Sequence, residues 1–288
     1  VMHLRSVDLG VPVVFMLADI LFKVFGFVLL YQSRNHKEYI NYATIFMIPF
    51  FIQALTGSRG ETIAMLILVL FIYSHFYHML KLTRAILYAG ILFFASIVID
   101  TLRFSREIGD VLANISILDL AVIAIANTSG SVGVIAYTIE LKDEFFNSIP
   151  FLFGYIQGIF SLAPNYTYEG IQNKNYLAQH ITYITEPTKL FNGSTIGTAM
   201  GAEFYEFSGG SMILIFILSI FLLYLCKYFI SRLNKNIITF YIGAIYFEAL
   251  LLSPRGSIMK IFSKETLISL LVLTLMVFLV KSYKKIEE

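Results

Sequence analysis

Two arginines in this chain stand beside glycine in short turns, where their side chains could bind an anion. Arg59 lies in Thr-Gly-Ser-Arg-Gly-Glu over residues 56–61, and Arg255 lies in Ser-Pro-Arg-Gly-Ser over residues 253–257. Glycine allows the backbone to approach a ligand closely. The planar guanidinium group binds phosphate through two parallel hydrogen bonds and stays charged at physiological pH. The pair of turns therefore predicts an anion site.

Two more arginines, Arg103 and Arg106, occur close together in Arg-Phe-Ser-Arg-Glu. We expect them to orient the same anion or a group attached to it. The alternative for any single arginine is that it caps a helix C-terminus or forms an ion pair. The carboxylates available for such pairs are those of Glu61, Asp100 and Glu265.

Carboxylates follow a stretch rich in glycine, serine and threonine. Residues 192–201 hold this stretch, and Glu203 and Glu206 come next in Ala-Glu-Phe-Tyr-Glu-Phe-Ser-Gly-Gly over residues 202–210. A carboxylate near arginines can act as a general base, and Glu203 is the candidate. Tyr205, between the two, is a further candidate for substrate binding. The alternative is that the carboxylates form salt bridges that position the arginines.

His180, the one histidine within residues 100–210, lies in Tyr-Leu-Ala-Gln-His and is the second candidate for accepting a proton. Histidine titrates near neutral pH and so suits proton abstraction. A lone histidine can equally have no chemical role. Histidines, cysteines and carboxylates do not occur at metal-ligand spacings, and Cys226 is the one cysteine. We therefore expect no metal, no cofactor and no nucleic-acid partner.

The elements that must position these residues are membrane helices. The chain is 58% hydrophobic and 14% charged, with a mean hydropathy of +0.77. A soluble domain is usually nearer half apolar and about a quarter charged. A membrane span needs roughly 20 largely apolar residues. The apolar runs predict seven spans, at residues 12–31, 41–57, 62–78, 85–99, 211–229, 237–252 and 266–281.

The positions of the basic residues give these spans an orientation. Lysine and arginine concentrate in loops on the cytoplasmic side of a membrane. Alternate loops carry such residues, namely Arg34, Lys37, Lys81, Arg84, Lys227, Arg232, Lys235, Lys281, Lys284 and Lys285. The other loops, which hold the four candidate arginines, then face outward. Arginine is uncommon in outward-facing loops. The presence of these four arginines there therefore suggests a functional role.

The organisation we predict is an all-α, polytopic membrane helix bundle in three parts. Residues 1–99 form about four spans, residues 100–210 a large extracytoplasmic loop, and residues 211–288 about three spans. Within the loop, the apolar spacing of residues 108–126 predicts an interfacial helix. Residues 145–162 are apolar but interrupted by polar residues, proline and glycine, so we expect a re-entrant or interfacial segment. The chain begins at Val1 rather than methionine, and we expect sequence upstream.

Two opposite charges, Asp19 and Lys23, lie four residues apart inside the first predicted span. Charged residues inside a membrane are functional candidates by default. At this spacing they share one helix face, where they can neutralise each other. We expect this structural role.

Taken together, these features resemble the O-antigen polymerases of the Wzy type. The resemblance rests on the long outer loop, the Gly-Ser-Arg-Gly turn at 57–60, the glycine-rich approach to residues 202–210, and the Pro-Arg-Gly turn at 254–256. It extends from the second predicted span to the sixth. The family tends to place asparagine before a Phe-Gly pair. This chain instead has Glu206 and then Ser208-Gly209.

The resemblance implies a C-type glycosyltransferase architecture. It implies undecaprenyl-diphosphate-linked glycans as donor and acceptor, joined at the outer face of the inner membrane. Arg59 and Arg255 would then bind the diphosphate, and Glu203 or His180 would accept the proton of the acceptor hydroxyl. Membrane lipid, a flippase and a chain-length regulator are the other implied partners. The polyprenyl chain needs an apolar groove, which the phenylalanines at 145, 146, 151, 153 and 160 could line unless they only anchor the interface.

Three other functions fit parts of this pattern. An O-antigen ligase would use the same donor but transfer the glycan to lipid A core, and would depend on His180 rather than Glu203. A flippase or other transporter of lipid-linked glycans would need intramembrane charges along a path, for which Asp19 and Lys23 are the one indication. A structural scaffold would leave the outer arginines without a reason.

Overall fold

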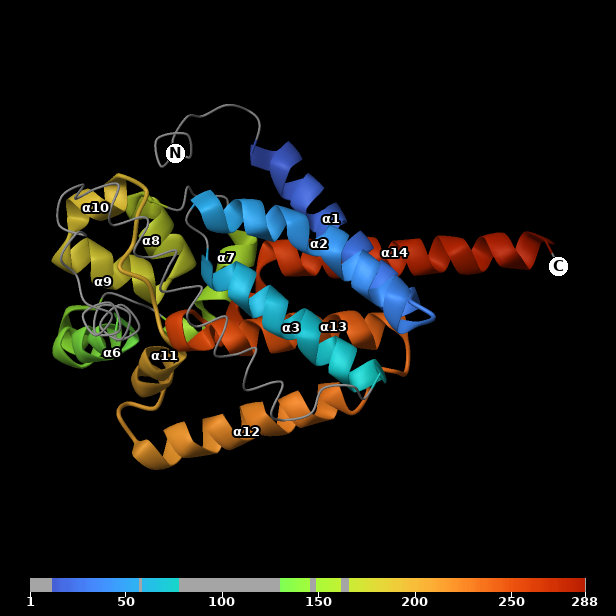
Figure 1. Ribbon diagram of the computed structural model, residues 1–288. Helices are drawn as coiled ribbons and strands as arrows, with labels where there is room; N and C mark the ends of the chain where they lie inside the picture. Colours follow the sequence, from blue (N-terminus) through green and yellow to red (C-terminus); the bar gives the residue numbers. More distant parts are fainter. Residues whose placement is uncertain (1–11, 57–58, 78–129, 146–148, 162–165, 288) are drawn as a thin grey trace, which may run out of the picture. The chain divides into compact units, whose positions relative to one another are not determined.

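The computed structural model describes residues 12–56, 59–77, 130–145, 149–161 and 166–287 (Figure 1). Every regular element within these ranges is a helix, and the ranges contain no strand, as the sequence predicted. Two compact units can be distinguished, and each is described by itself. The main unit comprises Val1–Tyr42 and Val134–Glu288, and the second unit comprises Ala43–Gly133.

The predicted spans outside residues 78–129 are all helical. They correspond to α1 (Pro12–Gln32), α2 (His36–Thr56), α3 (Arg59–Tyr77), α12 (Met212–Ile230), α13 (Ile237–Leu252) and α14 (Lys264–Glu287). Two stretches in the described chain, Gly60–Tyr77 and Met212–Ile230, are long and apolar enough to cross a membrane by length and composition. The predicted span at 85–99 and interfacial helix at 108–126 lie outside the described residues. The count of seven spans and the three-part division stay predictions.

Helix α1 carries the one pair of charges expected inside a span. The ammonium group of Lys23 lies 3.2 Å from a carboxylate oxygen of Asp19. The two residues are four positions apart and share one helix face. The expected neutralising contact is therefore confirmed.

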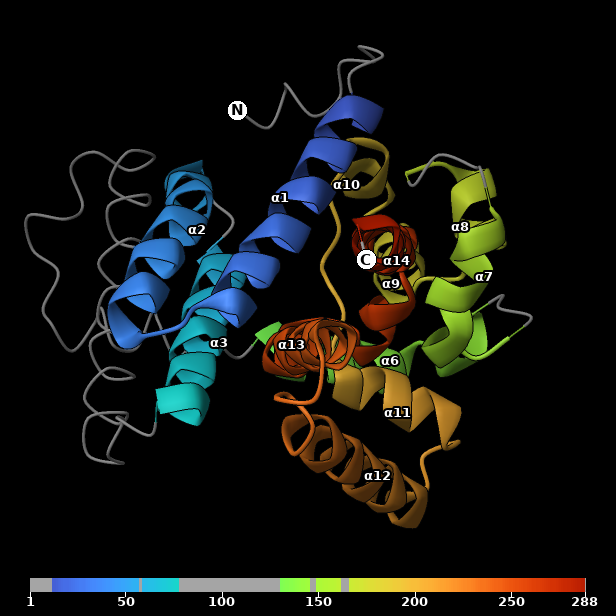
Figure 2. The same cartoon turned by 90° about the vertical axis from the view of Figure 1, so that its right-hand side faces the viewer.

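Helix α13 is the central element of the main unit. It packs against α1, α12 and α14, and against the short 3-10 helices η5 (Ser253–Arg255) and η6 (Ile258–Phe262) (Figure 2). Its buried face combines aromatic and small residues, which let neighbouring helices approach closely. Gly243 is the tightest point, because a β-carbon there would lie 2.8 Å from the Cδ2 atom of Leu233.

Helix α12 presents most of its apolar surface outward. Cys226 is its one buried residue, whereas Met212 and Ile213 are each 73% exposed. Its 19 residues correspond to about 28 Å at 1.5 Å per residue. This length matches the hydrocarbon core of a bilayer, about 30 Å thick. Lipid contact accounts for an apolar helix surface of this kind.

In the second unit, α3 is linked to the later part of α2 by a buried hydroxyl. The Oγ1 atom of Thr62 donates a hydrogen bond to the carbonyl oxygen of Phe50 over 2.7 Å. Such bonds satisfy polar groups between membrane helices at close approach. Met65, Leu68 and Ile72 on α3 are completely buried.

The described part of the large loop is built from short helices. They are α6 (Gly130–Glu140), η3 (Lys142–Glu144), η4 (Phe151–Phe153), α7 (Gly154–Phe160), α8 (Tyr168–Lys174), α9 (Leu177–Thr185), α10 (Pro187–Phe191) and α11 (Met200–Phe207). Helices η4 and α7 together hold ten residues, about half of what a span requires. They are too short to cross a bilayer, and the re-entrant or interfacial placement of this segment stays a prediction.

Two apolar clusters connect these short helices with the longer ones. The loop cluster contains Val134, Phe151, Leu177, Ile181, Ala199 and Ala202. The span cluster contains Leu152, Phe204, Ala249 and Ile258, with partly buried side chains of α12 packed against it. Consecutive residues of η4, and residues two apart on α11, thus enter different clusters. Helices η4 and α11 therefore each pack against both apolar clusters. The candidate carboxylates Glu203 and Glu206 lie on α11.

We predict that the close packing at Gly243 is essential for the stability of the main unit. The Gly243→Val variant should lower the free energy of unfolding by about 1–3 kcal/mol, because its side chain would overlap Leu233 and approach Phe229. Gly133→Val is the matched control, since nothing lies within 4 Å of a β-carbon built there. Thermal unfolding in detergent would measure both, and equal melting temperatures would contradict the prediction.

Candidate functional site

Glu203 is buried between two segments that are far apart in the sequence. Its side chain is 2% exposed on helix α11. The hydroxyl of Ser257 donates a hydrogen bond to Oε2 over 2.6 Å, and the hydroxyl of Thr198 donates one to Oε1 over 3.2 Å. Ser257 follows the Pro-Arg-Gly turn directly. The carboxyl group therefore joins the two motifs, at 202–210 and 254–256, that the sequence singled out separately.

Burial changes the acidity of this carboxyl group. Removal from water raises the pKa of Glu203 from an ordinary 4.5 to about 7. The hydrogen bonds from Ser257 and Thr198 oppose this rise, and the nearby carboxylate of Glu206 adds to it. A carboxyl group with a pKa near 7 is protonated and ionised in similar amounts at neutral pH. That property suits a group that accepts and releases a proton.

The end of α11 is shaped by two glycines. Gly209 and Gly210 have φ angles of 61° and 88°, in the left-handed region that favours glycine. A β-carbon on Gly210 would lie 3.3 Å from the hydroxyl oxygen of Tyr205. The half-buried Tyr205, a predicted substrate-binding residue, thus lies close to this turn. Glu206 accepts a hydrogen bond from the backbone N–H of Phe151 over 3.1 Å.

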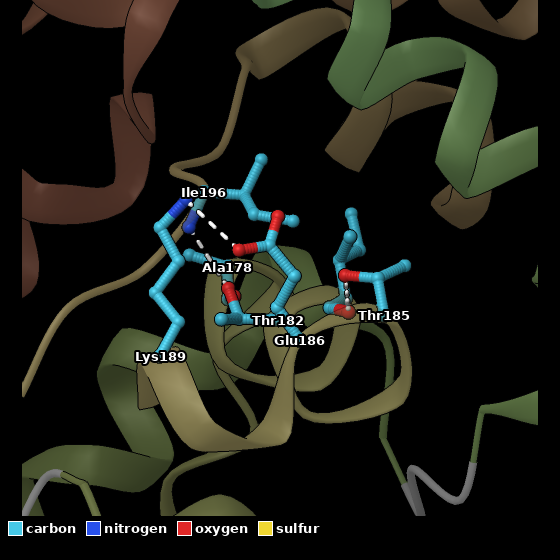
Figure 3. Close-up of polar contacts among 7 residues, drawn as sticks. Ala178, Thr182, Thr185, Glu186, Lys189 and Ile196 are labelled. Carbon is cyan, nitrogen blue, oxygen red and sulfur yellow. Dashed lines mark hydrogen bonds and ion pairs between the residues drawn. The ribbon is translucent and has the colours of Figure 1, made fainter. Parts of the chain in front are cut away.

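The glycine-rich stretch before α11 is attached to helix α9 by one threonine (Figure 3). The hydroxyl of Thr182 accepts a hydrogen bond from the backbone N–H of Ile196 over 2.9 Å and donates one to the carbonyl oxygen of Ala178. An ion pair between Glu186 and Lys189, 3.3 Å apart, lies beside it. Because Thr198 follows two residues after Ile196, this attachment also positions the hydroxyl that binds Glu203.

His180 lies against Phe151 of the loop cluster and is 1% exposed. Its ring centroid is 4.8 Å from that of Phe151, and its Nε2 atom is 3.3 Å from the carbonyl oxygen of Ile171. Burial lowers the pKa of His180 to about 4, although the hydrogen bond with Ile171 opposes the change. The imidazole is therefore neutral at physiological pH. Phe151 contacts His180 and, through its backbone, Glu206, whereas the carboxyl group of Glu203 bonds to Ser257 and Thr198.

The four predicted arginines are described in part or not at all. Arg59 is the first residue of α3, in the second unit, and Arg255 is the last residue of η5, in the main unit. The described part of the chain does not include their side chains, and Arg103 and Arg106 lie outside it entirely. The anion site formed by these arginines stays a prediction.

Several residues at the site did not stand out in the sequence. Ser257 and Thr198 are ordinary hydroxyl residues in turns, and only folding brings them to Glu203. Tyr155 on α7 is close enough for the charge of Glu203 to raise its pKa, although burial is the larger cause. Helical spacing could not place Tyr155 near Glu203. Among the described residues, no group of three histidines, cysteines or carboxylates could hold a metal ion.

Comparison with known proteins gives one match. A family model described as O-antigen polysaccharide polymerase Wzy matches residues 2–286. No curated protein and no solved structure matches the chain.

We predict that Thr182 is more important for stability than its neighbour Thr185. Thr182→Val would leave the backbone N–H of Ile196 without its partner inside the protein, which should cost about 1–3 kcal/mol. Thr185→Val is the control, because the Thr185 hydroxyl bonds to Ile181 of its own helix. Chemical denaturation followed by circular dichroism would compare the two variants. An equal loss of stability in both would exclude this role for Thr182.

The raised pKa of Glu203 predicts a specific dependence of stability on pH. The folded protein binds this proton more tightly than the unfolded chain, so the resulting stability is complete below about pH 4.5 and is lost as the pH rises through about 7. Glu203→Gln resembles the protonated group and does not titrate. Relative to this variant, the wild type should lose on the order of 3 kcal/mol between pH 4.5 and 8. Melting temperatures that change in parallel over this range would refute the raised pKa.

Proposed function

This chain belongs to the O-antigen polysaccharide polymerase Wzy family, and on that premise we propose that it joins lipid-linked oligosaccharide repeat units into a polysaccharide. The substrates we propose are undecaprenyl-diphosphate-linked glycans, one as donor and one as acceptor. The reaction would take place at the outer face of the bacterial inner membrane. Membrane lipid, a flippase and a chain-length regulator would be the other partners.

The proposed reaction is a glycosyl transfer. A hydroxyl oxygen of the acceptor sugar attacks the anomeric carbon of the donor and forms the new glycosidic bond. The bond between that carbon and the phosphate oxygen breaks, and the diphosphate leaves with the electron pair. The hydroxyl proton passes to a base. Two requirements follow, namely a proton acceptor and fixed positive charge near the leaving diphosphate.

Glu203 is the residue we assign as proton acceptor. The observation that supports this choice is its buried carboxyl group, bonded to Ser257 beside the Pro-Arg-Gly turn, with a pKa near 7. The acceptor must come within hydrogen-bond reach of this group. Thr198 is the more exposed of its two hydroxyl partners, so we propose that the acceptor approaches from the side of Thr198. Tyr205 would contact the glycan beside the turn that ends α11.

Arginine is the cation we assign to the diphosphate. Arg255 is two residues from Ser257, so the same turn that contacts Glu203 carries a guanidinium group. Arg59 would bind the diphosphate with it, and Arg103 and Arg106 would orient the glycan or phosphate. Arginines can stabilise the charge of a leaving diphosphate without a metal ion. The architecture would then be that of a C-type glycosyltransferase.

Two alternatives are less well supported. A ligase that depends on His180 would use this imidazole as its base, yet burial lowers the pKa of His180 to about 4, so the ring would bind a transferred proton weakly at neutral pH. A transporter would need intramembrane charges along a path, yet Asp19 and Lys23 are paired with each other.

Cells that lack this protein test the proposed function through their lipid-linked glycans. We expect single repeat units to accumulate, and the wild-type gene to restore long chains. Glu203→Gln retains hydrogen-bonding groups but cannot accept the proton, so it should reduce polymer formation by about 10²–10⁴-fold. Glu206→Gln is the matched control on the same helix and should keep most activity.

Other outcomes would favour other assignments. Accumulation of long lipid-linked chains, with His180 essential and Glu203 dispensable, would indicate a ligase. Single units confined to the cytoplasmic face would indicate a transporter. Full activity in both Arg59→Ala and Arg255→Ala would remove the diphosphate site from the proposal while leaving the polymerase assignment in place.

A further inference from the structure

Four aromatic side chains of the large loop have no role in the proposed mechanism. Tyr166 is 41% exposed, Tyr168 is 49% exposed and Phe191 is 52% exposed. The fourth, Tyr183, is partly buried. They come from α8 and the residues just before it, from α9 and from α10, which lie next to one another in Figure 1. A group of exposed apolar side chains of this kind often marks a binding surface.

Contacts between the rings join these side chains into one surface, which we call the aromatic row. The ring centroid of Tyr183 lies 5.7 Å from that of Tyr168 and 6.1 Å from that of Phe191. Tyr166 borders the same surface, because a β-carbon on Gly193 would lie 3.8 Å from its Cδ2 atom, and Gly193 follows two residues after Phe191. Tyr183 therefore supports a ring on each side and leaves both about half exposed.

The backbone fixes the aromatic row without a ligand. The hydroxyl of Thr167 accepts a hydrogen bond from the first turn of α8 over 3.0 Å, and Tyr168 is the first residue of this helix. Helix α10 ends at Phe191, where the backbone N–H of Gly193 donates a hydrogen bond to the carbonyl oxygen of Leu190 over 2.9 Å. Gly193 has a φ angle of 81°, which favours glycine. A surface fixed in advance loses little conformational freedom when it binds.

Polar side chains border the aromatic row. Glu169 and Asn192 are exposed, and each is next to one of its rings in the sequence. Glu186 and Lys189 form an ion pair whose side chains are 52% and 40% exposed. The surface therefore offers flat apolar rings together with carboxylate, amide and ammonium groups. It fits a ligand that carries both C–H and hydroxyl groups.

The contrast with α12 indicates that this ligand is a glycan rather than lipid. The exposed surface of α12 carries no charged residue from Met212 to Cys226. Charged groups next to the aromatic row would be costly in hydrocarbon. A sugar ring has C–H groups on its faces, which are attracted to the negative face of an aromatic ring. Its hydroxyls can bond to carboxylate and amide groups at the border.

The aromatic row is connected with the candidate active site by the glycine-rich stretch before α11. Thr198, the residue on whose side we place the acceptor, follows seven residues after Phe191. Their α-carbons are therefore at most about 25 Å apart. Thr182 of α9 holds this stretch in place by its hydrogen bond with the backbone of Ile196. An oligosaccharide can thus contact the aromatic row with some sugars while another sugar lies near Thr198.

We propose that the aromatic row binds the oligosaccharide of a substrate at sugars that do not react. Its rings contact the C–H faces of these sugars, and the polar border orients their hydroxyls. Binding energy from such remote sugars helps to position the reacting hydroxyl. The identification of this oligosaccharide with that of the lipid-linked acceptor rests on the proposed function.

Tryptophan fluorescence tests the aromatic row, because the chain contains no tryptophan of its own. Tyr168→Trp places a single reporter in the row and keeps an aromatic ring there. Tyr137→Trp is the matched control, since Tyr137 is a tyrosine of α6 that is 39% exposed. The probe is oligosaccharide that mild acid releases from the envelope of cells that make this protein. It carries no lipid, and it is added to the full-length protein in neutral detergent.

We expect a saturable shift of emission to shorter wavelength in Tyr168→Trp and no shift in Tyr137→Trp. Adding Phe191→Ala to Tyr168→Trp should weaken the binding about two- to tenfold, because one aromatic contact is lost. Phe191→Trp is a second reporter at the other side of Tyr183 and decides the matter if Tyr168→Trp does not fold.

Three results would overturn the proposal. The first is no response to the oligosaccharide from either reporter in the row. The second is an equal response from Tyr137→Trp, or equal binding with and without Phe191→Ala. The third is quenching of the reporter in the row by brominated phospholipid in vesicles without a response to oligosaccharide, which would identify a membrane contact.

Binding of this probe involves no turnover, so its result is separate from that of the polymerase test. A response specific to the aromatic row in a protein that makes no polymer would retain the row and reject the proposed function. Polymer formation without such a response would retain the function and reject the row.

Discussion

The contact between Glu203 and Ser257 is the constraint on which the site depends. A carboxyl group that is 2% exposed must be protonated or satisfied by donors, because an unpaired buried charge is costly. Two hydroxyls meet this need, one from the stretch before α11 and one from the turn after α13. The surrounding structure must therefore hold the hydroxyls of Ser257 and Thr198 in place. The hydrogen bonds that stabilise buried Glu203 therefore also set the acidity of its carboxyl group.

The packing around α11 supplies that support. On α11, Ala202 packs into the loop cluster and Phe204 packs into the span cluster. Rotation of α11 about its axis would therefore disturb both apolar clusters. Thr182 adds a polar attachment by holding the backbone at Ile196. Helix α13 connects this assembly with the longer helices through η5 and η6. A short helix of eight residues would not be stable alone, and tertiary contacts on two sides stabilise it.

The surroundings of Glu203 set the acidity of its carboxyl group. Around Glu203, hydroxyls and apolar side chains keep a carboxyl group near the midpoint of its titration. In a glycosyl transfer between two diphosphate-linked substrates, a proton acceptor and separate cationic sites are distinct requirements.

The sequence by itself determined the all-α class, the positions of the long apolar helices within the described residues and the Asp19–Lys23 pair, and it named Glu203 as a candidate. These depend on apolar run length, four-residue spacing and local motifs, which are properties of neighbouring residues. Only the tertiary structure decided that Ser257 and Thr198 bind Glu203, and that His180 packs against phenylalanines. The contact between Ser257 and Glu203 joins residues 54 positions apart. Its formation depends on how short helices pack, and local periodicity carries no information about that packing.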